Sequence, residues 1–278
     1  MLKFTVNIGM LFSELTFLDR FEACRLSGFK FVEFPFPYAF DPLSLSDYIR
    51  KAGLELILFD LPVDDWDSGG RGCATDPFAV DTFREGVERA IRYATVLRPK
   101  YLTCIVGNRL SGIPYSTQRD VLIDNMRYAS DMVFSMGIDL LVEIFNNYDN
   151  PDFFLTRVTD AIALVNEVNK PNFKIQIDTY HVQQMEGDLI PIIRRHINNI
   201  GHIQIGDVPG RHQPGTGLID FTLLFGELEQ LDYQGYIGLE YMPLGNTKDA
   251  LNWLKKFDHL SISSGNKSLK GCRNCGKE

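Results

Sequence analysis

The chain has 278 residues, of which 45% are hydrophobic, so it can bury one large core, and α/β barrels commonly reach this length as one domain. Its 36 acidic residues outnumber the 28 basic ones, and the net charge of −8 argues against binding to nucleic acid or to an anionic membrane. A soluble metabolic protein is expected.

The amino-terminal residues 1–8 alternate in the manner of a strand and lack the apolar run and small-residue cleavage site of a signal peptide. No stretch approaches the roughly 18 apolar residues that a membrane span needs. Cys24, Cys73 and Cys104 are scattered through a predicted helix, loop and strand, which is typical of reduced cysteines in the cytosol. These features predict a cytoplasmic protein.

Strand-like apolar runs recur along the chain and are separated by helical patterns. The runs cover residues 3–8, 29–34, 54–58, 101–106, 138–143, 173–178, 201–205 and 236–240. The clearest helical stripe contains Leu122, Met126, Ala129, Val133 and Met136, which share one helical face. Eight strands that alternate with eight helices favour a (β/α)8 barrel over a doubly wound sheet.

Glycines mark the ends of three predicted helices. Gly28, Gly53 and Gly137 stand where a left-handed residue ends a helix before the next strand. No glycine-rich phosphate loop follows the first strand, so no nucleotide cofactor is expected. We predict a single α/β domain, a TIM barrel, over residues 1–260.

The connection over residues 59–76 is the longest irregular one. It contains Asp64-Asp65-Trp66-Asp67 and Gly69-Gly70-Arg71-Gly72 and leaves the carboxyl end of the third strand. Barrels keep their active sites at that face, so a lid with glycine hinges is one interpretation and a solvated loop is the other.

After Leu260 the composition becomes rich in Ser, Gly, Asn and Lys, which predicts a disordered polar tail over residues 261–278. The tail contains Cys272-x-x-Cys275, half of a zinc site with no second half nearby. We assign it no role.

Four oxygen-bearing side chains end four successive predicted strands: Glu143, Asp178, Gln204 and Glu240. A barrel brings the ends of its strands to one pocket, where three carboxylates would repel each other without a cation. An all-oxygen ligand set suits Mg²⁺ or Mn²⁺ better than zinc. Any one of these residues alone is better explained as a helix cap or a partner of a lysine, and it is the group of four that indicates a metal site.

Two histidines accompany this group. His181 follows Asp178 by three residues, and we interpret it as a hydrogen-bond partner of the substrate or a proton carrier. His202 should point away from the side chain of Ile203 and is equally well explained as a packed structural histidine.

The segment from His202 to Gly217 resembles the hydroxypyruvate isomerase family, within the xylose-isomerase-like barrels. The resemblance runs to about residue 257 and includes Phe4-Thr5-Val6-Asn7, Val32-Glu33-Phe34, Arg84-Glu85-Gly86, Asn125-Met126-Arg127-Tyr128-Ala129, Asp178-Thr179-Tyr180-His181 and Gly238-Leu239-Glu240-Tyr241. It implies that Glu143, Asp178, Gln204 and Glu240 bind a divalent metal. It also implies that Glu143 and Glu240 are the acid/base pair.

The implied reaction interconverts hydroxypyruvate and tartronate semialdehyde, in carbohydrate metabolism, through an enediolate. Carboxylates suit the proton transfers, and a metal suits the enediolate oxygens. Three carboxylates and one divalent ion sum to −1, so an anionic substrate needs a cation of its own. Arg211, in the loop after the seventh strand, is the candidate, because a guanidinium can grip a carboxylate.

The chain departs from the usual pattern of the family at three places. Phe59-Asp60 stands where a His-Asn or similar pair is usual, Ile144-Phe145-Asn146 replaces Pro-Ile-Asn, and Gln213 replaces a glutamate. Asp60 adds a negative charge to the substrate pocket unless it is protonated or paired, and Gln213 removes one nearby. The metal set is intact, so these changes affect the choice of substrate more than the class of reaction.

Other functions remain open at this stage. A keto-sugar 3-epimerase or a 2-oxo-tetronate isomerase would use the same metal and proton transfer. A metal-dependent DNA-repair nuclease needs a histidine-rich zinc cluster and a basic groove, and a chain with 5 histidines and a net charge of −8 argues against it. A barrel that binds a small ligand without turnover is also compatible with the sequence.

Overall fold

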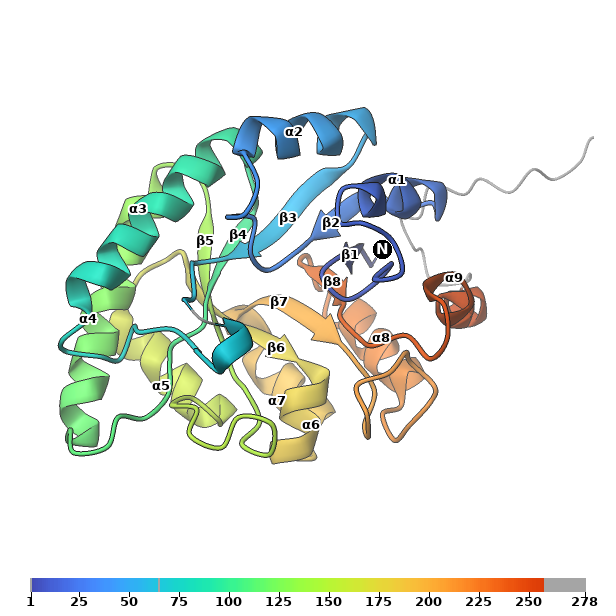
Figure 1. Ribbon diagram of the computed structural model, residues 1–278. Helices are drawn as coiled ribbons and strands as arrows, with labels where there is room; N and C mark the ends of the chain where they lie inside the picture. Colours follow the sequence, from blue (N-terminus) through green and yellow to red (C-terminus); the bar gives the residue numbers. More distant parts are fainter. Residues whose placement is uncertain (1, 65, 258–278) are drawn as a thin grey trace, which may run out of the picture.

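The computed structural model describes residues 2–64 and 66–257, and within them eight parallel strands form a closed barrel in chain order (Figure 1). The strands are β1 (Phe4–Asn7), β2 (Phe31–Glu33), β3 (Glu55–Asp60), β4 (Tyr101–Cys104), β5 (Asp139–Glu143), β6 (Phe173–Asp178), β7 (Ile200–Ile205) and β8 (Tyr236–Leu239). Parallel pairing of β1 with β8 closes the barrel. The predicted (β/α)8 barrel is confirmed, and each predicted strand overlaps an observed one.

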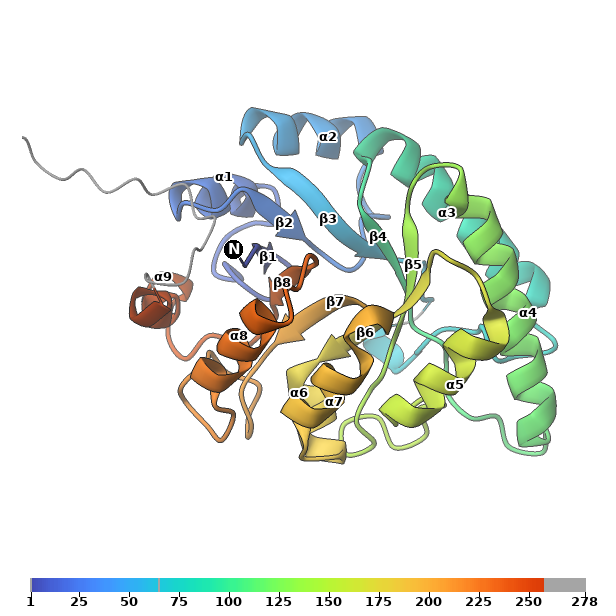
Figure 2. The same ribbon diagram turned by 180° about the vertical axis from the view of Figure 1, so that it is seen from behind.

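The helices lie around the outside of the barrel (Figures 1 and 2). The α-helices of the described residues are α1 (Asp19–Leu26), α2 (Pro42–Lys51), α3 (Val80–Leu97), α4 (Tyr115–Phe134), α5 (Val158–Val168), α6 (Thr179–Met185), α7 (Leu189–His196), α8 (Phe221–Gln230) and α9 (Thr247–Ala250). The connection after β6 contains both α6 and α7, so the described residues hold one helix more than the eight predicted. Gly187 separates these two helices with a positive φ of 74°.

Local sequence signals place the helices as predicted. The stripe on α4 is buried from Leu122 to Val133, which packs this long helix against the barrel. Gly28, Gly53 and Gly137 have φ values of 91°, 64° and 70°, as expected for residues that end a helix in the left-handed conformation.

An aromatic layer fills one part of the barrel interior. The ring of Tyr236 in β8 lies 5.0 Å from that of Phe31 in β2 and 6.2 Å from that of Tyr101 in β4. These strands are not neighbours in the sheet, so the rings meet inside the barrel. Side chains alternate along a strand, so residues two positions later, such as Glu33 and Thr103, face the interior nearer the carboxyl ends. The interior is therefore apolar at its base and polar at its mouth.

One buried carboxylate holds the connection after β7. Asp207 is 0% exposed, and its two oxygens accept hydrogen bonds of 2.8–3.1 Å from five backbone N–H groups. The donors are Val208, Gly215, Thr216, Gly217 and Ile219. The connection is thereby fixed without regular secondary structure. It carries Arg211 in the left-handed conformation (φ 55°), which is costly for a residue other than glycine.

None of the described helices is both long and apolar enough to cross a bilayer. Cys24, Cys73 and Cys104 are free thiols. The predicted tail over residues 261–278, with Cys272 and Cys275, lies outside the described residues.

Asp207→Asn is expected to lower the free energy of unfolding by about 3 kcal/mol, because an amide NH2 would face backbone N–H groups that then lose their acceptor. Asp41→Asn is the control, since Asp41 caps α2 through one backbone N–H, from Ser44, and asparagine caps as well as aspartate. Urea denaturation measures both. Equal stability of the two variants would contradict the role given to Asp207.

Candidate active site

A pocket of about 460 Å³ opens at the carboxyl ends of the strands. Its floor is formed by residues in or directly after the strands: Asn7, Asp60, Glu143, Gln176, Gln204 and Glu240. Trp66 and Arg71, from the connection after β3, form part of its wall. The long connection singled out in the sequence therefore faces this pocket.

Strand register brings the four predicted strand-end residues to one end of the barrel. Asp178 of β6 pairs with Gln204 of β7, and Glu143 of β5 pairs with Gln176 of β6. Glu143, Gln204 and Glu240 line the pocket directly. Asp178 is 0% exposed and lies behind them.

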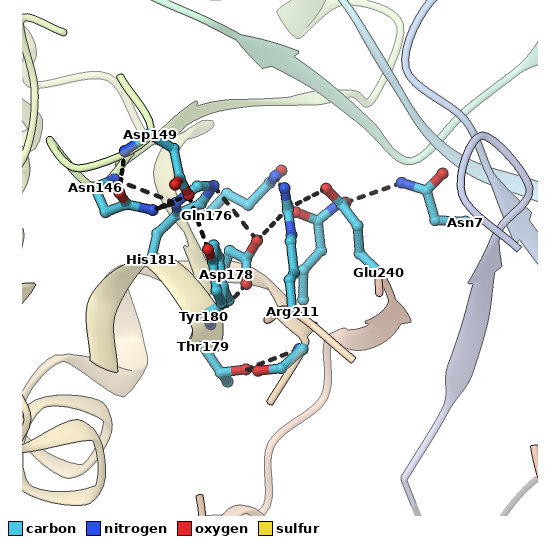
Figure 3. A network of polar contacts seen from close by, with 12 residues as sticks. Asn7, Asn146, Asp149, Gln176, Asp178, Thr179, Tyr180, His181, Arg211 and Glu240 are labelled. Carbon is cyan, nitrogen blue, oxygen red and sulfur yellow. Dashed lines mark hydrogen bonds and ion pairs between the residues drawn. The ribbon is translucent and has the colours of Figure 1, made fainter. Parts of the chain in front are cut away.

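The guanidinium of Arg211 lies between two of these carboxylates (Figure 3). Its Nη2 donates to Asp178 Oδ2 at 2.5 Å and to Glu240 Oε1 at 2.6 Å. Glu240 Oε2 accepts from Asn7 Nδ2 at 2.9 Å, and Asp178 Oδ1 accepts from the backbone N–H of Tyr180 at 2.9 Å. Arg211 is thus a counter-ion of the protein's own acids. Its contact with a substrate carboxylate stays a prediction.

Burial and mutual repulsion favour the protonated forms of the pocket acids. Burial raises the pKa of Glu143 well above its ordinary value, and Glu240 and Asp60 raise it further. Burial raises the pKa of Glu240 to about 7, although Arg211 opposes the shift. The pKa of Asp178 is raised by burial and lowered by Arg211, with a net upward shift. One guanidinium therefore does not fully compensate the acids, and a further cation would be stabilised here.

The donor atoms suit a hard divalent cation. One carboxylate oxygen each of Glu143 and Asp178 and one ring nitrogen of His181 lie within 4.8 Å of one another. His181 Nδ1 accepts from the backbone N–H of Asn146 at 3.2 Å, and burial lowers the pKa of the imidazole well below its usual value. The neutral ring then carries its proton on Nε2, 3.7 Å from Asp178 Oδ2. A protonated nitrogen cannot bind a metal, so the carboxylate oxygens remain as ligands.

A chain of hydrogen bonds beneath the acids orients Gln204. Gln204 Nε2 donates to Glu33 Oε1 at 2.9 Å, and because a carboxylate oxygen accepts, this contact fixes which end of the amide is nitrogen. Gln204 Oε1 accepts from Gln176 Nε2 at 2.7 Å, and Gln176 Oε1 accepts from Thr103 Oγ1 at 2.7 Å. His202, fully buried, has Nε2 3.0 Å from Glu33 Oε2 without the alignment of a hydrogen bond. The oxygen of Gln204 is thereby held in a set position at the pocket floor.

Several residues of this site carry no assignment from the sequence. Asn7 and Glu33 end β1 and β2 with a polar side chain after an apolar run, the same signal that marks Glu143 and Asp178. Gly238 belongs with them, since a Cβ atom there would lie 2.3 Å from Glu33 Oε1. The strand-end rule, applied to every strand, finds Asn7 and Glu33 but not Gly238, which lies within β8 and has no polar side chain.

The positions that depart from the family pattern differ in their surroundings. Asp60 lines the pocket, and burial, followed by the charges of Glu240 and Glu33, raises its pKa well above the ordinary value. Gln213 is not among the residues that line the pocket, and its Oε1 accepts from the backbone N–H of Leu244 at 3.0 Å. The glutamine therefore does not offset Asp60 within the pocket, and the protonated form of Asp60 is favoured by burial instead.

The metal-free protein should lose stability as pH rises from about 4.5 to about 7. In that interval folded Glu240 holds a proton that the unfolded chain, with the ordinary pKa of 4.5, has lost, so folding is favoured at the lower pH. Glu240→Gln should make the dependence less steep, and exposed Glu229→Gln should leave it unchanged. Urea denaturation of chelated protein at several pH values measures this. The same slope in both variants would contradict the raised pKa.

Comparison with known proteins identifies the family of this chain. Residues 21–257 match the model of the family described as xylose isomerase-like TIM barrel. The chain is 42% identical to hydroxypyruvate isomerase of Escherichia coli (strain K12) over 92% of this chain and 100% of that protein. It is 37% identical to 2-oxo-tetronate isomerase of Cupriavidus necator over 92% of this chain and 98% of that protein.

A solved structure described as AP endonuclease, family 2 from Brucella melitensis superposes with a TM-score of 0.90 and 36% sequence identity, over 92% of this chain and 99% of that one. The sequence match and the shared barrel agree over nearly the whole described chain. The protein belongs to the xylose isomerase-like TIM barrel family.

Proposed function

We propose that the protein is a metal-dependent isomerase that interconverts hydroxypyruvate and tartronate semialdehyde (2-hydroxy-3-oxopropanoate). The observation that carries this proposal is a pair of glutamates, buried Glu143 and partly buried Glu240, that face one pocket at the mouth of the barrel. The identity of 42% with a hydroxypyruvate isomerase along its full length supports the choice of reaction.

The reaction moves a carbonyl group between adjacent carbons. A base removes a proton from C3 of hydroxypyruvate, which gives an enediolate, and an acid then delivers a proton to C2. The proton of the C3 hydroxyl passes to the oxygen on C2, so that C3 becomes the aldehyde. Glu143 and Glu240 line the same pocket and suit these two transfers. In the absence of a metal the pKa of Glu240 is about 7, close to neutral pH, where an acid/base group works best.

The other residues of the pocket hold these groups and the substrate in place. Glu143, Asp178, Gln204 and Glu240 would hold Mg²⁺ or Mn²⁺, which supplies positive charge beside the developing enediolate oxygens. Asn7 Nδ2 donates to Glu240 Oε2 and so orients that carboxyl group. His181 keeps Nδ1 on the backbone of Asn146, which leaves its Nε2–H as a donor for a substrate oxygen.

A 2-oxo-tetronate isomerase is the second candidate. The identity of 37% with such an enzyme supports it, and a pocket of about 460 Å³ has room for a substrate of four carbons as well as three. A DNA-repair nuclease has less support. The proposed metal ligands include no histidine, and the chain is acidic.

Asp178→Ala and Gln204→Ala should each weaken Mn²⁺ binding by about tenfold or more, because each removes a proposed ligand. Gln213→Ala is the control, since it removes an amide outside the pocket. Calorimetric titration of chelated protein measures the affinity. Parent affinity in both site variants would rule out the ligand assignment.

Glu143→Gln and Glu240→Gln should keep the fold and slow proton transfer by about 10²-fold or more, as expected on loss of an acid/base group. NMR of hydroxypyruvate in deuterated water with Mg²⁺ follows the incorporation of deuterium. Exposed Glu229→Gln should exchange at the parent rate. If a site variant also exchanges at the parent rate, that glutamate carries no proton in the reaction.

A further inference from the structure

The proposed substrate is an anion, yet the pocket floor is acidic. Asp60, Glu143 and Glu240 all line it. Two arginines also belong to the lining, Arg71 and Arg211. Arg211 forms ion pairs through Nη2 with Asp178 and Glu240, so the protein's own acids already neutralise its positive charge. A bound carboxylate would therefore be stabilised best by a cation that has no such partner.

Arg71 meets this requirement. Its Nε donates to Asn150 Oδ1 at 2.6 Å, and its Nη1 donates to the backbone oxygens of Gly70 at 2.7 Å and Trp66 at 3.3 Å. All of these acceptors are uncharged, and within residues 2–64 and 66–257 Arg71 forms no ion pair. Among the described residues, its charge is therefore held in position without a carboxylate partner.

The same contacts leave one end of the guanidinium free to bind. Nε and Nη1 use their N–H groups on protein acceptors, whereas the two N–H groups of Nη2 have no hydrogen bond to the described part of the protein. The guanidinium also lies over the ring of Trp66, with Cζ 4.3 Å from the ring centroid. Stacking and three hydrogen bonds fix the long side chain before a ligand arrives, which lowers the entropic cost of binding.

We propose that Arg71 binds the carboxylate of the substrate through Nη2 and selects anionic hydroxy-keto acids over neutral hydroxy-ketones. The assignment rests on the proposed function for the identity of the substrate. It places the recognition of the anion on the wall of the pocket and leaves the reacting carbons for Glu143 and Glu240 at the floor. Arg211 then acts as the counter-ion of the acids.

Turnover of two substrates by the Mg²⁺-loaded full-length protein tests the proposal. Arg71→Met should lower kcat/KM for hydroxypyruvate by about 30-fold or more, the loss expected for a charged hydrogen bond, and change that for dihydroxyacetone by less than threefold. Arg71→Lys keeps the charge and should recover part of the loss. Arg109→Met is the control, because Arg109 also stacks on an aromatic ring, that of Tyr115, but does not line the pocket. Equal losses for the two substrates, or no loss for either, would overturn the proposal.

Binding without turnover separates this proposal from the proposed function. Glycerate, an anion that cannot isomerise in this way, should bind to the parent protein and to Arg109→Met, and at least tenfold more weakly to Arg71→Met, as followed by NMR titration with glycerol as the neutral reference. Circular dichroism checks that each variant is folded. If the parent incorporates no deuterium into any hydroxy-ketone, the proposed function fails, and glycerate alone decides on Arg71. The role of Arg71 would be overturned if Arg71→Met bound glycerate as tightly as the parent does, or if the parent did not bind glycerate.

Discussion

The contact of the Arg211 guanidinium with Asp178 and Glu240 is the interaction on which the mouth of the barrel depends. Carboxyl groups buried this closely repel one another when ionised, and one positive charge between two of them reduces that repulsion. Other buried polar residues hold the partners of this contact in position. Asp207 fixes the connection that carries Arg211, and Asn7 holds the far oxygen of Glu240. The raised pKa values of the acids show that the compensation is incomplete, which is the condition under which a metal ion binds well.

The sequence alone predicts the strands and the polar residues at their ends. Apolar runs place the strands, and the strand ends place Glu143, Asp178, Gln204 and Glu240, because a closed parallel barrel has one geometry at its carboxyl ends. Applied to all strands, the same rule also finds Glu33. The strand-end rule does not predict which residues of the connections line the pocket. The wall of the pocket depends on contacts such as that of Arg71 with Asn150, 79 residues apart, and no periodicity in the sequence encodes such a contact.

The two pocket arginines show why a residue type alone does not assign a role. Both belong to irregular connections at the carboxyl ends of the strands, and from the sequence we predict only Arg211 as the partner of an anion. Their hydrogen-bond partners differ in charge: carboxylates surround Arg211, whereas an amide and backbone carbonyls hold Arg71. The difference comes from the fold, and it separates an internal counter-ion from a group whose charge is available to a ligand.

The floor of the pocket comes from the strands, whereas part of its wall comes from the single connection between β3 and α3. Much of that connection lies outside the hydrogen-bonded sheet, although Leu61, Ala74 and Thr75 are buried and Gly72 leaves no room for a side chain. Over evolutionary time the exposed positions of this long connection can therefore change while the strands keep their acids, so that the wall of the pocket is altered without its floor. Because the floor and part of the wall of the pocket come from different segments, relatives with the same acids and different substrates are expected.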